Sequence, residues 1–451
     1  MNVIIAGCGR VGATLAEQLC LEGHDITVID NDYERVSQIV NLADVRGITG
    51  NAASYATQME ADIDKADLMI AVTSADEINL LSCLIAKKAG NCQTIARVRN
   101  PIYHDEIRHI REELGLSMAI NPERTAAEEV ARLLRFPSAI EVDSFCKGQI
   151  ELLKLKITEQ SALCNCRLLD IVNRMRCDVL VCIIERGNEV LIPNGQMMIQ
   201  AGDLISVVAS STNVNRFFKA AGIVTNQVKN AMLIGGGRTS FYLAKLLLEM
   251  GIRVKIIEKD RQRCEDLSEQ LPDAMIICGD GTDQELLLEE GVARMESIAA
   301  LTDIDEENVM LALYARSVSK GKMITRVNVD TYDAILNNLD IGSVIHPKAV
   351  TTESILQYVR AMQNTVGNNV ETLYRLVNNR VEALEFRIRE KSAVTDVPLK
   401  DLRTRDGLLL CAIRRNNRII IPRGQDSIQV GDSVVVITTV LGLKDIGDIL
   451  K

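Results

Sequence analysis

The chain has 451 residues, of which 47% are hydrophobic and 25% charged, and its formal net charge is −10. These proportions are typical of globular proteins and exclude a disordered chain, a collagen-like fibre and a small disulfide scaffold. A general nucleic-acid-binding protein is a poor candidate, because the chain is acidic and has 3% aromatic residues and no tryptophan. Without an apolar run of about 18 residues or a secretory signal pattern, we expect a soluble, intracellular protein.

Short apolar segments alternate with amphipathic ones along the first part of the chain. We expect strands near residues 2–6, 25–30, 45–49, 68–72, 94–98 and 117–120, with helices near 10–22, 33–42, 54–60, 76–89 and 102–114. This alternation predicts a parallel sheet with helices on both faces. Pro122 then opens a helix that runs to about Leu134 and is ended by Pro137.

The next segment, near residues 140–222, has a different pattern. Strands are expected around 150–157, 179–185 and 203–209, with one helix near 168–176. A segment of this size and composition predicts a small α+β module.

The chain then repeats itself. Residues 2–10 return as 230–238 at an offset of 228, and six further blocks, up to 201–203 and 430–432, recur in the same order at nearly the same offset. Such order cannot arise from composition bias, so the chain is a tandem duplication. We predict four domains at 1–136, 137–223, 228–363 and 370–451, with a boundary near 224–229 and a polar linker at 364–369.

The first strand of copy one leads into a glycine-rich turn, Gly7-Cys8-Gly9-Arg10-Val11-Gly12. This is the G-x-G-x-x-G pattern whose glycines permit a tight turn, close approach of a pyrophosphate and close helix packing. Asp30 follows 18 residues after Gly12, at the end of the second strand, where a carboxylate can accept the ribose hydroxyls. The combination predicts a nucleotide site, and the alternative is a plain tight turn in a degenerate copy.

Copy two carries Gly235-Gly236-Gly237-Arg238-Thr239-Ser240 at the same place. Ser240 replaces the third glycine, which should still allow near-normal packing, and Glu258 keeps the acid 18 residues further on. Both acids would repel a 2′-phosphate, so NAD(H) or an adenine nucleotide is favoured over NADP.

Other polar residues follow the strands and should converge on the same pockets, because ligands bind at the carboxyl ends of parallel strands. Asn51 and Asp280 follow the third strands and are expected beside the adenosine. The remaining candidates are Thr73, Ser74 and Arg97 in copy one and Thr302, Asp303 and Arg326 in copy two, with Arg10 and Arg238 placed to meet a terminal phosphate.

Two functions compete for this architecture. An NAD-dependent oxidoreductase needs a general acid or base beside the nicotinamide, and the four histidines neither recur between the copies nor lie in a catalytic context. The pair Cys164 and Cys166 lacks a C-x-x-C spacing and a nearby histidine, so a metal site is not favoured. Two nucleotide sites without catalytic residues favour a regulatory binding protein, and the oxidoreductase stays as the alternative.

Several motifs resemble one family over essentially the whole chain. They are the first glycine-rich turn with Asp30, the segment Thr73-Ser74-Ala75-Asp76-Glu77-Ile78-Asn79, Ile95-Ala96-Arg97-Val98-Arg99, and the two Gly-Asp elements Gly202-Asp203 and Gly431-Asp432. With the duplication, they resemble the RCK (KTN) family of potassium-transport regulators, and within it the TrkA family. Asn51 and Ser240 depart from the family pattern, at a position where the family often has an acid or histidine and at the third glycine.

The resemblance implies a fold and a function that the residues alone do not give. The fold would be α/β, two Rossmann-like RCK-N domains each followed by a small α+β RCK-C domain. The protein would be a cytoplasmic, non-enzymatic subunit at the inner face of the membrane, gating a Trk-type potassium-translocating partner as a homo-oligomer, most simply a tetramer. NAD(H), with ATP or ADP as further nucleotides, would bind the RCK-N domains, and the helices after Pro122 and Pro347 would serve as hinge and dimer contacts.

Overall fold

The computed structural model describes residues 1–146, 149–175, 177–210, 213–223, 228–328, 336, 339, 341–363, 370–377, 380–416 and 418–451. The predicted linker at 364–369 and most of the predicted boundary near 224–229 lie outside these residues. The chain divides into two compact units, one made of Met1–Val130 with Ala231–Leu356 and the other of Ala131–Asn230 with Gln357–Lys451. Each unit therefore combines equivalent parts of the two copies.

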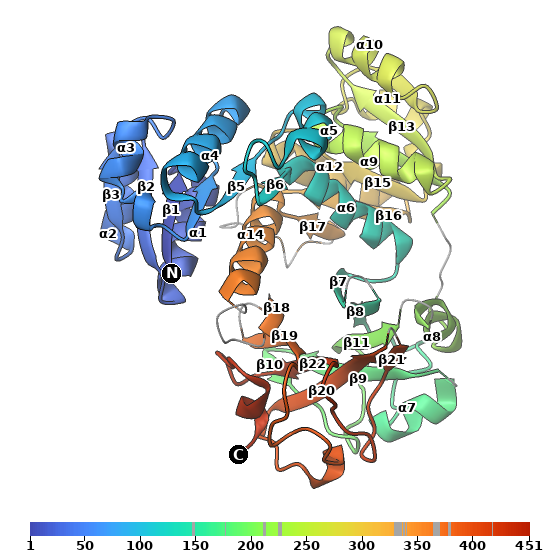
Figure 1. Ribbon diagram of the computed structural model, residues 1–451. Helices are drawn as coiled ribbons and strands as arrows, with labels where there is room; N and C mark the ends of the chain where they lie inside the picture. Colours follow the sequence, from blue (N-terminus) through green and yellow to red (C-terminus); the bar gives the residue numbers. More distant parts are fainter. Residues whose placement is uncertain are drawn as a thin grey trace. The chain divides into compact units, whose positions relative to one another are not determined.

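The first part of copy one forms a six-stranded parallel sheet in the order β3-β2-β1-β4-β5-β6 (Figure 1). Its strands are β1 (Asn2–Ala6), β2 (Asp25–Asp30), β3 (Arg46–Thr49), β4 (Leu68–Ala71), β5 (Gln93–Arg97) and β6 (Met118–Ile120). The helices are α1 (Arg10–Leu21), α2 (Tyr33–Leu42), α3 (Tyr55–Glu60), α4 (Asp76–Gly90), α5 (Pro101–Ile110) and α6 (Pro122–Arg135), with a 3₁₀ turn η1 (Ile63–Lys65). The strand order reverses between β1 and β4, and such a switch point is where parallel sheets bind ligands.

Copy two repeats this sheet in the order β14-β13-β12-β15-β16-β17. Its strands are β12 (Asn230–Ile234), β13 (Arg253–Glu258), β14 (Met275–Cys278), β15 (Ser297–Ala300), β16 (Lys322–Arg326) and β17 (Ser343–Ile345). The helices are α9 (Arg238–Glu249), α10 (Arg261–Gln270), α11 (Gln284–Glu289), α12 (Asp305–Val318) and α14 (Pro347–Gln363), with η2 (Val292–Arg294). The two sheets belong to one unit, in which the buried Asn121 side chain donates to the Tyr242 hydroxyl at 3.0 Å.

The second part of copy one is a five-stranded sheet in the order β10-β9-β11-β8-β7, whose pairs are antiparallel. Its elements are β7 (Glu141–Phe145), β8 (Ile150–Lys156), α7 (Leu168–Met175), β9 (Val179–Arg186), β10 (Glu189–Leu191), β11 (Leu204–Ser210) and α8 (Val214–Ala220). The predicted helix near 168–176 is present, while β7, β10 and α8 were not predicted. Three-residue β10 is too short to give an alternating pattern, which explains why it was missed.

The second part of copy two has the order β18-β19-β22-β20-β21. Its elements are β18 (Val370–Leu376), β19 (Val381–Arg387), η5 (Leu399–Asp401), β20 (Leu408–Arg415), β21 (Arg418–Ile420), β22 (Ser433–Thr438) and η6 (Ile446–Ile449). The copies have diverged here, because the short 3₁₀ turn η5 stands where copy one has the helix α7. Pro398 immediately precedes this turn.

These two modules share one hydrophobic core. Side chains of copy one, including Phe145, Cys182 and Val208, form a single buried cluster with Ala383, Cys411 and others of copy two. Across it, the rings of Phe145 and Tyr374 meet edge to face at 4.9 Å between centroids. Neither module buries these faces by itself, so the two C-terminal modules of one chain fold against each other.

The Gly-Asp elements have a structural role. Gly202 and Gly431 adopt φ of +89° and +94°, a conformation that favours glycine. The following carboxylates are buried, and Asp203 accepts two hydrogen bonds from the Arg186 guanidinium at 2.8 Å, as Asp432 does from Arg415 at 2.9 and 2.7 Å. The Arg186 guanidinium holds the pKa of Asp203 below its usual range.

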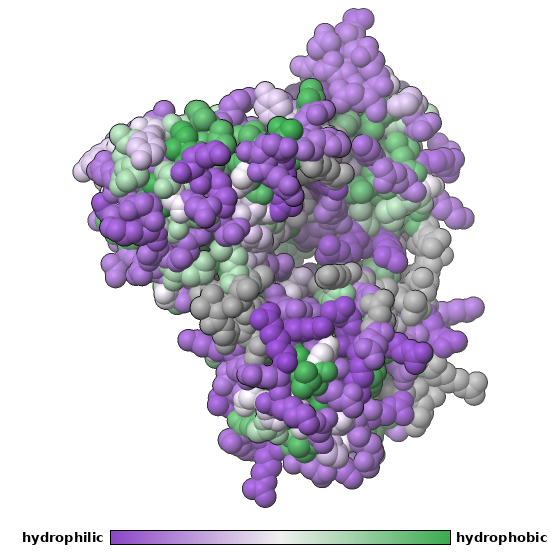
Figure 2. Space-filling model, viewed as in Figure 1, coloured by the Kyte–Doolittle hydropathy of each residue, from purple (hydrophilic) through white to green (hydrophobic). Residues whose placement is uncertain are grey.

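Searching the part of the chain that the structure describes, we find no helix long and apolar enough to cross a membrane. The face in Figure 2 is predominantly hydrophilic, with apolar side chains in scattered groups.

The Asp203–Arg186 pair predicts how one module responds to acid. Because the folded-state pKa of Asp203 is depressed, its contribution to stability is present above the unfolded pKa of ~4 and is lost as the pH falls through the folded pKa. We expect Asp203→Asn to lower the apparent free energy of unfolding by about 1.5–3 kcal/mol at pH 7, with a smaller difference from wild type at pH 3 and below, where the Asp203 carboxylate begins to be protonated in the folded state as well. Urea denaturation followed by circular dichroism measures both values. Asp406→Asn, at an exposed carboxylate, is the control, and an equal loss at both pH values would contradict the assignment.

Candidate functional site

The glycine-rich turn of copy one has the geometry that its sequence predicts. Gly7 adopts φ +105°, and a Cβ there would lie 2.8 Å from the backbone nitrogen of Thr73. A Cβ on Gly12 would lie 1.8 Å from the Gly7 carbonyl oxygen, so the helix can pack this closely only without a side chain. Gly9 is different, because its Cβ would meet nothing within 4 Å. The space beside Gly9 is open, and a phosphate could approach the backbone there.

In copy two, Ser240 takes the place of the third glycine without blocking the turn. Its side chain is fully buried and its hydroxyl donates a hydrogen bond to the Gly235 carbonyl oxygen. Gly235 keeps a φ of +100°, close to that of Gly7, and a Cβ on Gly237 would again meet nothing within 4 Å. The expectation of near-normal packing around Ser240 therefore agrees with the structure.

The acid of each copy is fixed by backbone amides. One oxygen of Asp30 accepts from the Cys8 amide at 2.6 Å and the other from the Asp32 amide at 3.0 Å. In copy two, Glu258 makes the same bonds with the amides of Gly236 and Asp260 at 2.6 and 2.8 Å. Each carboxylate oxygen has a second lone pair free in this arrangement, which suits two ribose hydroxyls.

The longer acid of copy two explains a difference in the turns. Copy one has Cys8 where copy two has Gly236. A Cβ on Gly236 would lie 2.7 Å from Leu267 Cδ1, 2.8 Å from the Glu258 carboxylate and 2.9 Å from the Glu258 Cγ, so the longer glutamate, together with Leu267, occupies the space that a cysteine side chain would need. Cys8 itself is buried, and burial together with Asp30 raises the pKa of its thiol to about 12.

The helices that follow the turns begin without a side-chain cap. Gly9 and Gly237 are the N-cap residues of α1 and α9, and neither helix has an acidic residue in its first turn. By contrast, α2 and α10 are capped by the carboxylates of Asp32 and Asp260. An uncapped helix start leaves backbone N–H groups and the positive end of the helix dipole free for an anion.

An asparagine that the sequence analysis quoted but did not assign to the site ties the fourth and fifth strands together. Asn79 accepts from the Thr73 amide at 2.8 Å and donates to the Arg97 carbonyl at 2.9 Å, and it is fully buried. Asn308 makes the corresponding bonds to Thr302 and Arg326. The Thr73 hydroxyl donates to the Asn79 side chain, so this hydroxyl helps to hold the loop after the fourth strand in place.

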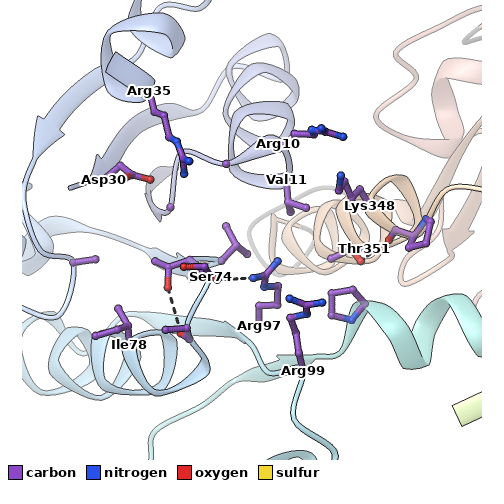
Figure 3. Close-up of a pocket in the computed structure, with 18 of the residues that line it drawn as sticks. Arg10, Val11, Asp30, Arg35, Ser74, Ile78, Arg97, Arg99, Lys348 and Thr351 are labelled. Atoms are coloured by element: carbon purple, nitrogen blue, oxygen red, sulfur yellow. Dashed lines mark hydrogen bonds between the residues drawn. The ribbon is translucent and has the colours of Figure 1, made fainter. Parts of the chain in front are cut away.

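A cavity of about 660 Å³ lies over these elements of copy one. Of the eleven residues predicted for this copy, nine line it: Gly7, Gly9, Arg10, Val11, Asp30, Asn51, Thr73, Ser74 and Arg97. Cys8 and Gly12, the other two predicted residues, do not line the cavity. Figure 3 shows the side chains of Arg10, Arg35 and Asp30 around the space above the turn.

The cavity is strongly basic. Its lining holds six basic side chains and two acids, and one of the acids, Glu123, is paired with Arg99. Burial lowers the pKa of Arg97, whose Nη2 donates to the Thr73 carbonyl at 2.7 Å and whose Nε has no hydrogen-bond partner among the described residues. This excess of positive charge favours a ligand with more than one phosphate.

Part of this lining comes from copy two. Thr239, Arg326, Asn328, Pro347, Lys348 and Thr351 line the cavity. Lys348 and Thr351 come from the first turns of α14, which Figure 3 shows beside Arg97 and Arg99. Thr239 and Arg326 were expected around a copy-two nucleotide, but they line the copy-one cavity. Arg238 lines neither of the two cavities described here.

Sequence reasoning missed Arg35, Arg99 and the α14 residues. Arg35 had a detectable signal, since an arginine stands five residues after the acid in both copies, as Arg35 and Arg263. Lys348 had none, because only the fold brings the start of α14 to the other copy's turn.

The copy-two cavity, of about 460 Å³, has the opposite charge. Its lining includes seven of the predicted residues: Gly235, Gly236, Gly237, Glu258, Asp280, Thr302 and Asp303. Five acids face two basic side chains, Lys259 and Arg263. Arg263 donates to the Gly236 carbonyl at 2.9 Å, and Arg326 is paired with Asp303 at 3.0 Å. This acidic lining is less suited to polyphosphates than that of copy one.

Among the residues described in either copy, no cluster of three or more His, Cys, Asp or Glu side chains could hold a metal ion.

Comparison with known proteins finds two kinds of domain, each matched twice along the chain. The TrkA-N domain model matches residues 3–122 and 231–347, and the TrkA-C domain model matches 152–222 and 383–451. A Trk system potassium uptake protein TrkA homolog of Archaeoglobus fulgidus is 33% identical over 437 residues, 97% of each chain. The TrkA protein of Haemophilus influenzae is 31% identical, over 97% of this chain and 95% of its own.

Among solved structures, the GsuK channel bound to NAD matches with a TM-score of 0.62 and 16% identity, covering 97% of this chain and 76% of that one. The GsuK RCK domain matches with a TM-score of 0.61 and 16% identity, covering 97% of this chain and 92% of that one. At this identity the likeness concerns the fold, and it confirms the predicted arrangement of two Rossmann-like domains, each followed by a smaller one.

Two glycines of one turn should respond differently to the same substitution. Gly12→Ala places a Cβ against the Gly7 carbonyl, and overpacking of this kind costs about 1–3 kcal/mol. Gly9→Ala points into open space and should leave the unfolding temperature of the ligand-free protein unchanged. Thermal unfolding of the two variants measures the difference. Equal destabilisation by both would show that the space beside Gly9 is not open.

Proposed function

The chain belongs to the TrkA family, and from this premise we propose that it binds NAD(H) or an adenine nucleotide in the copy-one cavity and thereby gates a potassium-translocating membrane partner. Family membership makes it a regulatory protein of potassium uptake rather than an enzyme, as its sequence led us to expect. The nucleotide and the gating are the proposed part.

The observation that carries the proposal is the composition of the copy-one cavity. The fixed Asp30 carboxylate, the open space at Gly9 and the uncapped start of α1 lie together on its wall. Asp30 would hold the adenosine ribose and the amides after Gly9 would hold a pyrophosphate. Arg10 and Lys348 supply charge for a terminal phosphate or for the second half of a dinucleotide.

Charge favours copy one as the principal site. An adenine nucleotide carries up to four negative charges, and the copy-two lining has more acids than bases. The Arg326 guanidinium of copy two is paired with Asp303 and also lines the copy-one cavity. We therefore propose that copy two binds polyphosphates more weakly, although its turn and acid are intact.

A ligand in this cavity would touch both copies at once. The first turns of α14, with Lys348 and Thr351, belong to copy two, while α1 and Asp30 belong to copy one. A ligand that binds both sets of side chains favours the arrangement in which they lie together, and this differential affinity is what a gating ligand requires. We propose α6 and α14 as the helices that transmit the change.

The remaining part of the proposal concerns assembly. A regulator of ion uptake must contact the membrane protein that it controls, so we propose a cytoplasmic location at the inner face of the membrane. The assembly proposed is a homotetramer docked on the potassium-translocating subunit, since a closed ring of duplicated chains would pass a change in each copy-one cavity to its neighbours.

Asp30→Ala tests the nucleotide and the gating together. It removes the acceptor of the ribose hydroxyls, and a hydrogen bond to a charged group is worth roughly 1.5–3 kcal/mol, so affinity for NADH and ADP should fall about tenfold or more. Calorimetry measures this affinity, and potassium flux through the reconstituted partner should need correspondingly more nucleotide. Glu258→Ala is the matched change in copy two and should have the smaller effect. Unchanged affinity in Asp30→Ala, or flux indifferent to nucleotide in the wild type, would refute the proposal.

Lys348→Gln tests whether copy two contributes to the copy-one site. Loss of one cation should weaken ADP and ATP binding roughly threefold to tenfold and leave adenosine binding unchanged, because adenosine has no phosphate to meet the lysine. Lys245→Gln, at an exposed position of α9, changes the net charge equally and is the control. An equal effect of the two variants would indicate only a long-range influence of net charge.

A further inference from the structure

Two cysteines lie together at the edge of the copy-two sheet, outside the residues assigned to nucleotide binding. Cys278 is the last residue of β14, the edge strand, and is exposed, while Cys264 in the first turns of α10 is buried. The Cys264 thiol donates to the Glu258 carbonyl at 3.3 Å, and Glu258 is the register partner of Cys278 in the parallel β13–β14 pair. Burial first, and then the neighbouring Cys278 thiol, raise the pKa of Cys264 to about 12.

We propose that Cys264 and Cys278 form a thiol–disulfide switch, which a small disulfide oxidant closes and a thiol reopens, and that closure weakens nucleotide binding in the copy-two cavity. The effect on nucleotide binding rests on the proposed nucleotide function, whereas the disulfide switch itself rests on the placement of the two thiols.

The pair is specific to copy two. The equivalent positions in copy one are Val36 and Thr49, which occupy the same places on α2 and β3 and cannot form a disulfide. The chain has another pair of interacting thiols, Cys182 and Cys411, but both lie fully buried in the shared core of the C-terminal modules. An exposed attacking thiol beside a buried partner is thus the combination that distinguishes Cys264 and Cys278.

The chemistry proceeds by two exchanges. The Cys278 thiolate attacks the oxidant disulfide, forms a mixed disulfide and releases one small thiol. The Cys264 thiol then loses its proton to solvent and its sulfur attacks that of Cys278, which releases the second small thiol. The protein dithiol is oxidised, the small disulfide is reduced to two thiols, and the steps reverse with excess thiol. Because Glu258 and Asp260 lie beside Cys264, a neutral or cationic disulfide should react faster than an anionic one.

Closure would act on the nucleotide cavity through α10. A disulfide brings two sulfur atoms to about 2.05 Å, closer than any non-bonded contact, so closure would draw the start of α10 toward β14. Arg263, the residue before Cys264, donates to the Gly236 carbonyl in the glycine-rich turn. Glu258 accepts from the amide of the same Gly236, is the register partner of Cys278 and accepts from the Cys264 thiol at its carbonyl. Any shift of α10 is therefore transmitted to the turn and the ribose acceptor.

Peptide mapping of the full chain tests disulfide formation. Trypsin cleaves after Arg263 and next after Arg294, so both cysteines fall in the single peptide 264–294. After treatment with hydroxyethyl disulfide and alkylation of the remaining thiols, we expect most of this peptide to be unalkylated and two hydrogen atoms lighter, and to be restored by dithiothreitol. Cystamine should act at least as fast, and oxidised glutathione more slowly. A peptide that stays reduced, or that carries adducts without ring closure, overturns the proposal.

The chain offers its own controls. Cys264→Val and Cys278→Thr install the residues of copy one, and either should abolish the lighter peptide. Cys182 and Cys411 should remain alkylatable after unfolding, because their burial denies the oxidant access. Oxidation of these buried thiols to the same extent would show general unfolding and would overturn the specific switch.

Nucleotide binding tests whether the disulfide weakens binding in the copy-two cavity. In Asp30→Ala protein, where copy two is the intact site, ADP and NADH affinity should fall severalfold on oxidation and recover on reduction. In the Asp30→Ala, Cys278→Thr protein, oxidation should change nothing. Disulfide formation with unchanged affinity overturns the linkage. If copy two binds no nucleotide in either redox state, both the copy-two site and its coupling to the disulfide are overturned. Disulfide formation is then still judged by peptide mapping, and the proposed function by nucleotide binding in copy one.

Discussion

The hydrogen bond from the glycine-rich turn to the acid at the end of the second strand is the constraint on which each site depends. It joins Cys8 to Asp30 in copy one and Gly236 to Glu258 in copy two, at 2.6 Å in both. The bond holds the turn against the second strand and directs the carboxylate toward the space where a ribose would lie. The donor is a backbone amide in both copies and a carboxylate accepts in both, so the bond survives the change of Asp to Glu, and Gly236 supplies the room that the longer side chain needs.

With this frame preserved, duplication has let the two sites diverge in what surrounds them. Copy one has Arg99 where copy two has Asn328, and copy two has the third-glycine substitute Ser240. The larger change is in charge, since copy one gathers basic residues from both copies and copy two keeps mainly acids. The same turn and acid therefore stand beside a basic cavity lined by both copies and beside an acidic cavity with a different ligand preference. The edge of the acidic cavity carries Cys264 and Cys278.

Much of this was predictable because the turn, its acid and the strand ends are local in sequence. Gly7 to Asp30 lies within one strand–helix–strand unit, so spacing alone places the residues together, and the duplication supported the assignment of the turn and its acid. Three features were not accessible. Lys348 and Thr351 reach the copy-one cavity only through packing of the two copies. Short strands such as β10 carry too few residues for a pattern. The pairing of Cys264 with Cys278 needs the register of β14 against β13, which propensity does not determine.

The central claim is that one nucleotide bridges both copies in the copy-one cavity. A crystal structure of the full chain with NADH or ADP tests it most directly. We predict the ribose hydroxyls on Asp30, a pyrophosphate at the amides after Gly9, and Lys348 within hydrogen-bonding distance of a phosphate or of the second nucleoside. A ligand bound in the copy-two cavity alone, or one in the copy-one cavity that contacts no residue of copy two, would contradict the account.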